Sequence, residues 1–279
     1  MSELRIAFFG DIVGGPGRRA FANAVQVTKA THAPDVVIVN GENARNGSGL
    51  HPEGYREIRA AGADAITLGD HCFGDMRVKA VFADESAPVA RPANLSDSAP
   101  GRTFARVGTT TPPIFVVPLM GRLFMKFPVN DPFAALTATV GEITAAHPDA
   151  IVITDMHAEA TSEKIAMAHH ALRTHPRTVL AVVGTHTHVQ TNDARIISHT
   201  DETSGETATI AAITDLGMCG GHGGVIGRSA TAVLDMMTTQ RPTHLEVTGD
   251  ETQARGVLIT LNTETRQAIA IEPLVIDDA

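Results

Sequence analysis

Two histidines, His186 and His188, follow a short apolar run and are candidates for metal binding. The run covers Thr178–Val183, is typical of a buried strand, and ends at Gly184. Alternate residues of an extended chain point to the same side, so both imidazoles can reach one point in space. Histidine at the end of a buried strand is a suitable metal ligand, but two histidines do not complete a site. On this stretch alone, a polar turn with two solvated histidines is the alternative.

The same arrangement recurs at four other apolar runs. They cover Leu4–Phe9, Asp35–Val39, Ala63–Leu68 and Ala150–Thr154. Carboxylate, amide or imidazole side chains follow each run within a few residues. Ligands of open α/β sheets bind beyond the carboxyl ends of parallel strands, so the five runs would bring one set of polar side chains to one edge. The set consists of Asp11, Glu42, Asn43, Asp70, His71, His157, His186 and His188.

The segments between the runs predict helices that connect a largely parallel sheet. We expect helices near residues 18–31, 52–61, 75–83, 131–147, 161–175 and 228–238. The glycines at 14, 15 and 17 predict a tight loop after the first strand, although it lacks the Gly-Lys-Ser/Thr ending of a P-loop. Near the end of the chain, residues 194–199 and 207–213 predict a hairpin, and residues 256–261 and 268–275 predict an antiparallel pair.

Length and composition exclude several classes of protein. A chain of 279 residues with 43% hydrophobic content fits one large α/β domain or two small ones. The net charge of −9 argues against a general nucleic-acid binder, which needs a basic face. We find neither an apolar run long enough to span a membrane nor a secretory signal at the first residues. The two cysteines, Cys72 and Cys219, give no disulfide framework, so we expect a cytoplasmic protein.

The predicted set of ligands suits phosphate-ester hydrolysis. Two histidines and a carboxylate can hold one divalent ion, and eight such groups are enough for two. Two ions about 3.5–4 Å apart bind phosphate oxygens and lower the pKa of a bridging water, so that a metal-bridging hydroxide is the nucleophile. Asp11, Glu42 and Asp70 would repel one another without cations if they packed together. The alternative is that these carboxylates cap helices and turns.

Six stretches, in this order, carry a resemblance to a known family. They are Gly10-Asp-Ile-Val-Gly14, Asn40-Gly-Glu-Asn43, Gly69-Asp-His71, Asp155-Met-His-Ala-Glu-Ala-Thr-Ser-Glu-Lys164, Gly184-Thr-His-Thr-His188 and Thr214-Asp-Leu-Gly-Met218. With them the chain resembles the calcineurin-like metallophosphoesterases, and most closely the bacterial YmdB-like subgroup, which is linked to cyclic-nucleotide phosphodiesterase activity.

The resemblance implies a fold, a ligand set and a catalytic residue. The fold would be a four-layer α/β/β/α sandwich, with residues 1–279 as a single metallophosphoesterase domain. One metal would be held by Asp11, Glu42 and His188, with Asn43 close by, and the other by Glu42, Asp70, His157 and His186. His71 would be the general acid that protonates the leaving oxygen. The two divalent ions would be Mn or Fe in the first place, with Zn or Co as alternatives.

The chain departs from the wider family at two positions. Calcineurin-like enzymes have Asp-x-His at the first strand, whereas this chain has Asp11-Ile-Val13. The YmdB-like subgroup lacks the same histidine. At the third strand Asp70 stands where the family and the subgroup have asparagine. A carboxylate still binds a hard metal, but it adds a negative charge that should weaken the attraction of a phosphate.

These observations favour a metal-dependent phosphodiesterase acting on small phosphodiesters, with 2′,3′- or 3′,5′-cyclic nucleotides as the expected substrates. A phosphomonoesterase with the same two-metal chemistry remains open, because only the shape of the pocket separates the two reactions. A regulatory protein that binds a nucleotide or RNA with little turnover is the alternative from another class. A homo-oligomer is compatible with the sequence, and we expect neither a membrane partner nor general nucleic-acid binding.

Overall fold

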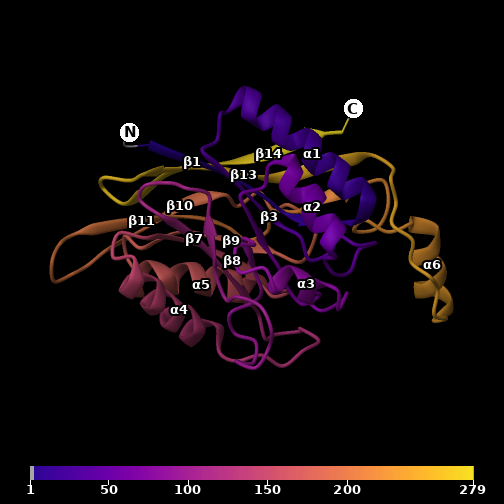
Figure 1. Ribbon diagram of the computed structural model, residues 1–279, viewed down its shortest axis with the longest axis horizontal. Coiled ribbons are helices and arrows are strands. Elements are labelled where there is room, and N and C mark those ends of the chain that lie inside the picture. Colours follow the sequence, from indigo (N-terminus) through magenta and orange to yellow (C-terminus); the bar gives the residue numbers. More distant parts are fainter. Residues whose placement is uncertain (1–2, 279) are drawn as a thin grey trace.

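Two mixed β-sheets make up the centre of the computed structural model, which describes residues 3–278 (Figure 1). In the first sheet, the strand order is β2-β12-β13-β1-β3-β4-β5, and β14 pairs with β13. The strands are β1 (Glu3–Phe9), β2 (Asp11–Ile12), β3 (Val36–Asn40), β4 (Ala65–Thr67), β5 (Val89–Ala90), β12 (Met218–Gly221), β13 (Thr252–Asn262) and β14 (Gln267–Asp277). Strands β1, β3, β4 and β5 are parallel, so their carboxyl ends lie at one edge.

The second sheet has the strand order β10-β11-β9-β8-β7-β6. Its strands are β6 (Ala105–Val107), β7 (Ile114–Met120), β8 (Ile151–His157), β9 (Val179–Thr185), β10 (Arg195–Thr200) and β11 (Thr207–Ile213). The four central strands are parallel, whereas β6 and β10 run antiparallel at the two edges. The carboxyl ends of β8 and β9 therefore lie on the same side of the sheet, and the predicted histidines are found there.

Helices accompany both sheets, and Figure 1 shows α1 and α2 beside the first sheet and α4 and α5 beside the second. The helices are α1 (Gly14–Thr31), α2 (Pro52–Ala61), α3 (Val78–Phe82), α4 (Pro132–Ala146), α5 (Thr161–Thr174) and α6 (Ala230–Thr239). Helix α4 begins where the sequence predicts, because the Asp131 carboxylate accepts hydrogen bonds from the backbone N–H groups of Phe133 and Ala134. Pro132 follows at the first helical position, where no backbone N–H is needed.

Three apolar clusters connect these elements, and β1 shows how one strand serves two of them. Ile6 and Phe8 belong to a cluster with Val116 of the second sheet, so they lie between the sheets. Their neighbour Phe9 packs on the other side, where its ring meets that of Phe21 in α1 edge-on at 5.6 Å. Alternate residues of a strand point to opposite faces, which accounts for the division. The third cluster lies between the second sheet and helices α4 and α5.

The structure differs from the sequence prediction at the glycines after the first strand. Residues 14–17 are not a loop but the first turn of α1, which begins at Gly14 rather than near Arg18. Gly14 has φ of +63°, and a side chain at Gly17 would meet the Cys219 carbonyl oxygen at 2.2 Å. These glycines therefore let the helix start close to β12. The predicted hairpin and the final antiparallel pair are confirmed as β10–β11 and β13–β14.

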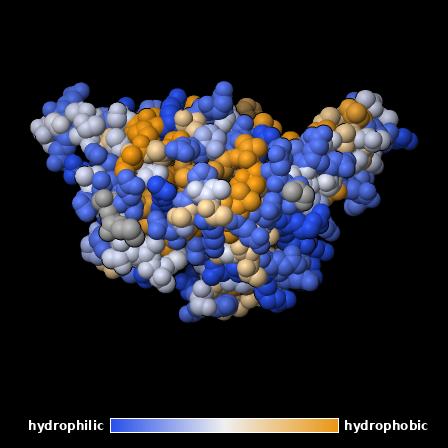
Figure 2. Space-filling view, turned by 90° about the horizontal axis from the view of Figure 1, so that it is seen from above, coloured by the Kyte–Doolittle hydropathy of each residue, from blue (hydrophilic) through white to orange (hydrophobic). Residues whose placement is uncertain are grey.

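Helix α6 projects from the side of the molecule, at the right of Figure 1. Leu234 and Met237 on this helix are exposed. The face in Figure 2 is largely hydrophilic with separate hydrophobic patches, one of them on the lobe at the right. Within residues 3–278, none of the helices combines the length and the apolar character that a membrane span requires.

Candidate metal centre

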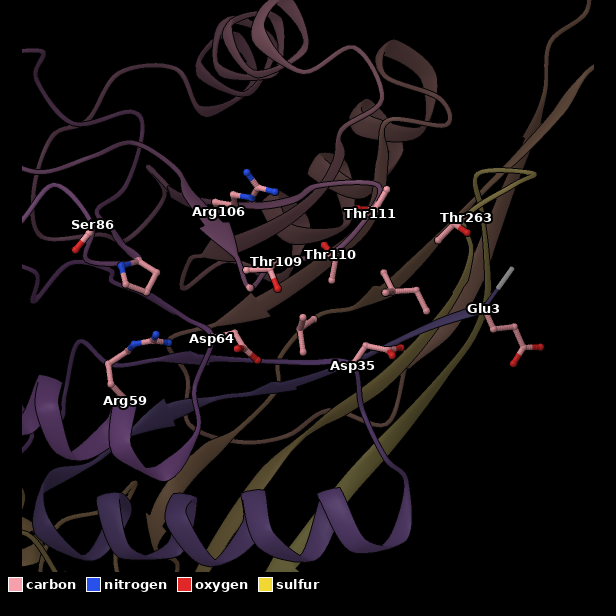
Figure 3. Close-up of a pocket in the computed structure, with 14 residues that line it drawn as sticks. Glu3, Asp35, Arg59, Asp64, Ser86, Arg106, Thr109, Thr110, Thr111 and Thr263 are labelled. Carbon is pink, nitrogen blue, oxygen red and sulfur yellow. The ribbon is translucent and has the colours of Figure 1, made fainter. Parts of the chain in front are cut away.

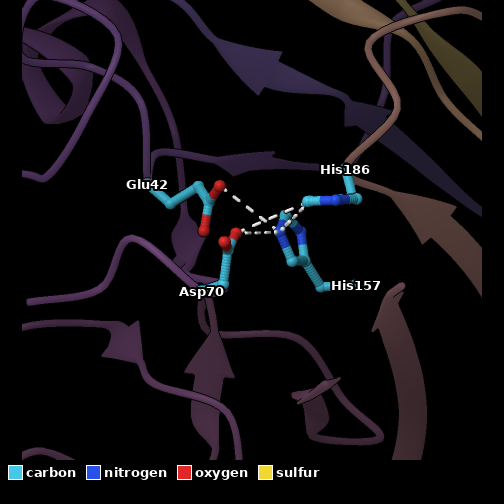
Figure 4. A group of neighbouring side chains, drawn as sticks. All are labelled: Glu42, Asp70, His157 and His186. Carbon is cyan, nitrogen blue, oxygen red and sulfur yellow. Dashed lines mark hydrogen bonds and ion pairs between the residues drawn. The ribbon is translucent and has the colours of Figure 1, made fainter. Parts of the chain in front are cut away.

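Four of the predicted ligands, two from each sheet, meet at the carboxyl edges of the strands (Figure 4). Glu42 and Asp70 follow β3 and β4, whereas His157 ends β8 and His186 follows β9. One nitrogen or oxygen atom of each residue lies within 4.8 Å of the others. His157 Nε2 is 3.0 Å from Asp70 Oδ1 and 3.3 Å from Glu42 Oε1. Two carboxylates and two imidazoles at this spacing form a donor set that suits a divalent transition metal.

A buried carboxylate, Asp155, orients the ring of His157 through the Thr185 hydroxyl. The Thr185 hydroxyl donates to Asp155 Oδ1 at 2.7 Å and lies 2.8 Å from His157 Nδ1. A hydroxyl that donates to Asp155 accepts from Nδ1–H, which leaves Nε2 free to act as the ligand atom. Asp155 Oδ2 also accepts from Thr67 at 2.5 Å and from Asn40 at 3.2 Å, so this one residue joins the two sheets. Burial raises the pKa of Asp155, which is opposed by His157 and by these hydrogen bonds.

The two histidines after β9 lie on a strained loop and not on an extended strand. Strand β9 ends at Thr185, and His186 and His188 have φ of +104° and +65°. Such values are rare outside glycine and persist only where neighbouring contacts hold them. Asp215 supplies the contacts, because its Oδ2 accepts from both the backbone N–H (3.1 Å) and the hydroxyl (2.8 Å) of the intervening Thr187. A buried ion pair to Lys164 Nζ at 2.7 Å holds Asp215 in turn.

Because of this geometry, the two histidines belong to different groups of ligands. His186 joins the four residues of Figure 4, and its Nδ1 lies 3.1 Å from His157 Nε2. His188 Nε2 lies 3.2 Å from Asn43 Nδ2 and 3.9 Å from Asp11 Oδ1, which makes a second, looser group of Asp11, Asn43 and His188. Glu42 lies between the groups, because its Oε1 accepts from Asn43 Nδ2 at 3.0 Å.

The second group contains buried atoms that a cation would satisfy. Asn43 Oδ1 is among the few buried side-chain oxygens that lack a hydrogen-bond partner in the described part of the chain. Asp11 is fully buried, and burial together with the nearby charge of Glu42 raises its pKa to about 7, against the opposing effect of His157. An unpartnered carbonyl oxygen and a carboxylate that burial holds partly protonated both favour an added positive charge.

His71 lies beside the four-residue group and remains accessible. Its backbone N–H donates to Glu42 Oε2 at 3.0 Å, its Nδ1 is 3.2 Å from Glu42 Oε1, and its side chain is 43% exposed. The hydrogen bond with Glu42 raises the pKa of His71 despite its partial burial, so the imidazolium form persists to higher pH. Since Nδ1 faces Glu42, Nε2 is the ring nitrogen that can reach a substrate.

Gly69 is the residue that allows the four ligands to approach one another. A Cβ atom at this position would lie 2.3 Å from Glu42 Oε2 and 2.3 Å from His157 Cδ2. Both distances are far below van der Waals contact, so any side chain would displace two ligands at once. The glycine that precedes Asp70 in the sequence therefore serves close packing of the site.

Two cavities lie at opposite edges of the sheets. A cavity of about 700 Å³ opens at the amino ends of β1, β3, β4 and β5, away from the ligands (Figure 3). Its labelled side chains include Arg59 and Arg106 as well as Asp35 and Asp64, so it carries charges of both signs. A pocket of about 490 Å³ lies next to the four-residue group and is lined by Asp70 and His71. The smaller pocket is thus the one beside the predicted chemistry.

Residues 7–274 match the YmdB-like protein family over nearly the whole chain. The chain belongs to this family. Over 275 residues it is 37% identical to the 2′,3′-cyclic-nucleotide 2′-phosphodiesterase of Bacillus subtilis (strain 168), an alignment that covers 99% of this chain and 98% of that protein.

Two crystal structures have the same fold as this YmdB-like protein. One is a hypothetical protein from Thermus thermophilus, 36% identical, with a TM-score of 0.84 and coverage of 99% of this chain and 100% of that one. The other is described as a novel phosphatase from Mycoplasma pneumoniae, 29% identical, with a TM-score of 0.84 and coverage of 99% and 94%. The mixed α/β architecture of this chain is therefore shared with these two structures.

All eight residues named from the sequence lie at the carboxyl edges of the strands in this YmdB-like protein, in the two groups and beside them. Sequence reasoning missed the residues that hold them in place, chiefly Asp155, Thr185, Lys164 and Asp215. All four stand in the motifs that carry the family resemblance, and that position was the available signal. It also missed Glu159, whose carboxylate lies 3.2 Å from His186 Nε2.

Proposed function

We propose that this chain is a metal-dependent phosphodiesterase for small phosphodiesters, with 2′,3′-cyclic nucleotides as the favoured substrates. The observation that carries the proposal is the meeting of Glu42, Asp70, His157 and His186 at the edge of two sheets. The chain is a phosphoric ester hydrolase, since relatives along its whole length are named as phosphodiesterase or phosphatase. The name of the Bacillus subtilis relative supports the cyclic-nucleotide substrate.

We further propose that the site holds two divalent ions, with Mn or Fe favoured over Zn or Co. The four residues of Figure 4 would hold one ion, and Asp11, Asn43 and His188 would hold the other, with Glu42 shared. The unpartnered Asn43 Oδ1 supports the second position. Bound there, the ions would neutralise phosphate oxygens and lower the pKa of a water.

In this proposal His71 donates the proton to the leaving oxygen. Glu42 holds Nδ1, so Nε2 faces the pocket that adjoins the ligands. The hydrogen bond with Glu42 raises the pKa of His71, which favours the protonated ring that a general acid requires. Asp155 and Asp215 contribute indirectly, because they fix the ring of His157 and the loop that carries His186.

We also propose that the chain forms one domain with four layers, α/β/β/α. The three apolar clusters support this arrangement, since one lies between the sheets and one lies beneath each group of helices. The ligands come from both sheets, so a single domain would complete the site.

Hydrolysis of 2′,3′-cyclic AMP by chelator-stripped protein, with Mn²⁺ added back, tests the function. We expect turnover only with metal, and a loss of about 100-fold or more in kcat for His71→Ala with metal content unchanged. His199→Ala is the matched control, because that histidine lies on the edge strand β10 near the amino end of β9.

Other outcomes would redirect the proposal. Turnover of adenosine 3′-monophosphate but not of the cyclic diester would indicate a phosphomonoesterase, in line with the phosphatase name of the Mycoplasma pneumoniae relative. Metal-loaded protein that binds 2′,3′-cyclic AMP without turnover, and equally well as His71→Ala, would indicate a regulatory nucleotide binder.

A further inference from the structure

The pocket beside the metal centre is built from three loops and is mostly apolar. The loops follow β4, β5 and β7, and the pocket volume of about 490 Å³ is in the range of small-molecule sites. Asp70 and His71 form its end at the ligands. The apolar lining includes Cys72, Phe73, Leu95, Met120, Phe127 and Pro128.

The loop after β7, residues 121–129, is fixed at both ends. Asn94 accepts from the Met120 N–H at 2.8 Å and donates to the carbonyl oxygens of Met120 at 2.7 Å and of Asn130 at 3.0 Å. Glu163 accepts from the N–H of Arg122 at 2.8 Å. One buried asparagine thus joins the two ends of the loop, which runs between β7 and α4 in Figure 1. Residues 126–128 of this loop line the pocket.

Phe127 lies on this loop with 49% of its surface exposed, although it also lines the pocket. Lys126 lines the pocket as well, with its Nζ 5.7 Å from the centre of the Phe127 ring. A half-exposed aromatic ring on a fixed loop beside a site is more informative than an isolated surface apolar residue. A flat apolar group in the pocket would cover the exposed side of Phe127, and the lysine could donate to a heteroatom at its edge.

We propose that this pocket holds the nucleobase of a cyclic nucleotide whose phosphate lies at the metal centre, and that Phe127 packs on the base. The inference rests on the proposed function. Continuity supports it, because the pocket begins at Asp70 and His71, where the phosphate would be bound, and extends into apolar surface. A nucleobase is the flat, largely apolar part of such a substrate, and stacking on an aromatic side chain suits any base.

The test compares Phe127→Ala with Phe124→Ala on two cyclic diesters. Phe124 lies on the same loop, is 86% exposed and does not line the pocket. The substrates are 2′,3′-cyclic AMP and glycerol 1,2-cyclic phosphate, which has the same five-membered ring without a base. For Phe127→Ala we expect KM for cyclic AMP to rise about 10-fold, with kcat and the base-free substrate unchanged. Phe124→Ala should match the wild type on both substrates.

A binding measurement separates affinity from turnover. Calorimetry of 2′,3′-cyclic AMP with metal-loaded His71→Ala protein, and with the same protein carrying Phe127→Ala, should show about 10-fold weaker binding in the latter. Equal effects of Phe127→Ala on both diesters, or no effect on either, would overturn the base pocket while the phosphodiesterase function stands. If the wild type hydrolysed neither diester, the proposed function would fail, and the inference with it.

Discussion

Carboxylates have different partners at the amino ends of the parallel strands (the amino edge) and at their carboxyl ends (the carboxyl edge). At the amino edge, Asp35 accepts the N–H of Arg5 at 2.7 Å and Asp64 accepts the N–H of Val37 at 2.8 Å, so each carboxylate satisfies a backbone group at the start of a strand. At the carboxyl edge, Glu42 and Asp70 both approach His157, and one oxygen of each lies within 4.8 Å of the other. The amino edge nevertheless has the larger cavity, about 700 Å³ against about 490 Å³.

The partners of the carboxylates, and not the size of a cavity, therefore identify the candidate site. A carboxylate that accepts a backbone N–H is already satisfied and has a structural role. Carboxylates and imidazoles that crowd together are costly without a cation and therefore indicate a ligand. Paired substitutions at the two edges test this distinction.

Replacing one glycine by alanine at each edge should give the largest difference in activity. Gly69→Ala would place a Cβ atom 2.3 Å from Glu42 Oε2 and should lower kcat/KM and metal content together, the former by about 100-fold or more. Gly108→Ala, in the amino-edge cavity, has φ of +59° and a closest contact of 3.2 Å to Val36. It should lower the free energy of unfolding by about 1 kcal/mol without changing activity.

Metal analysis, steady-state kinetics and thermal unfolding measure the two effects. Full metal content in Gly69→Ala would show that the ligands tolerate displacement and would contradict the arrangement of Figure 4. A loss of activity in folded Gly108→Ala would assign the amino edge a part in the reaction and contradict the different roles of the two edges.

Replacing one aspartate by asparagine at each edge should give the second largest difference, in metal affinity. Asp155→Asn would turn an amide N–H₂ towards hydroxyls that now donate to Asp155, and should release the ring of His157. We expect about 10-fold weaker metal binding. Asp64→Asn keeps an oxygen for the N–H of Val37 and should leave metal affinity unchanged. Titration of stripped protein with Mn²⁺ checks both, and equal affinities for the two variants would remove Asp155 from its proposed positioning role.

Features of the fold that depend on residues close together in the sequence could be predicted from it. The five apolar runs predicted the strands that supply the ligands, because burial of a strand and the residues that follow it are local properties. The predicted helices near residues 52–61, 131–147 and 161–175 are present within a residue or so as α2, α4 and α5. Proline at the start of α2 and α4 marks both helices in the sequence.

The parts that could not be predicted depend on contacts between distant segments. Gly14–Gly17 was predicted as a loop, and its place in α1 follows from close approach to β12, about 200 residues later. The positive φ of His186 likewise accompanies contacts with distant residues, because Asp11 accepts from the His186 N–H and Asp215 accepts from the Thr187 N–H. The short strands β2 and β12 form because β12 pairs with both β2 and β13, segments that are far apart in the sequence.

The smallest effect should come from Asp70→Asn, which asks whether charge or the oxygen atom matters at the carboxyl edge. Asparagine keeps a carbonyl oxygen where Asp70 Oδ1 lies 3.0 Å from His157 Nε2, and it removes one of the negative charges that a phosphate must approach. We expect kcat/KM within about threefold of the wild type, whereas Asp70→Ala, which removes the oxygen, should lose metal. At the amino edge, Asp35→Asn retains an acceptor for the N–H of Arg5, so kcat/KM should likewise stay close to the wild-type value. If Asp70→Asn abolished metal binding, the carboxylate charge itself would be required, and Asp70 would not act simply as an oxygen ligand.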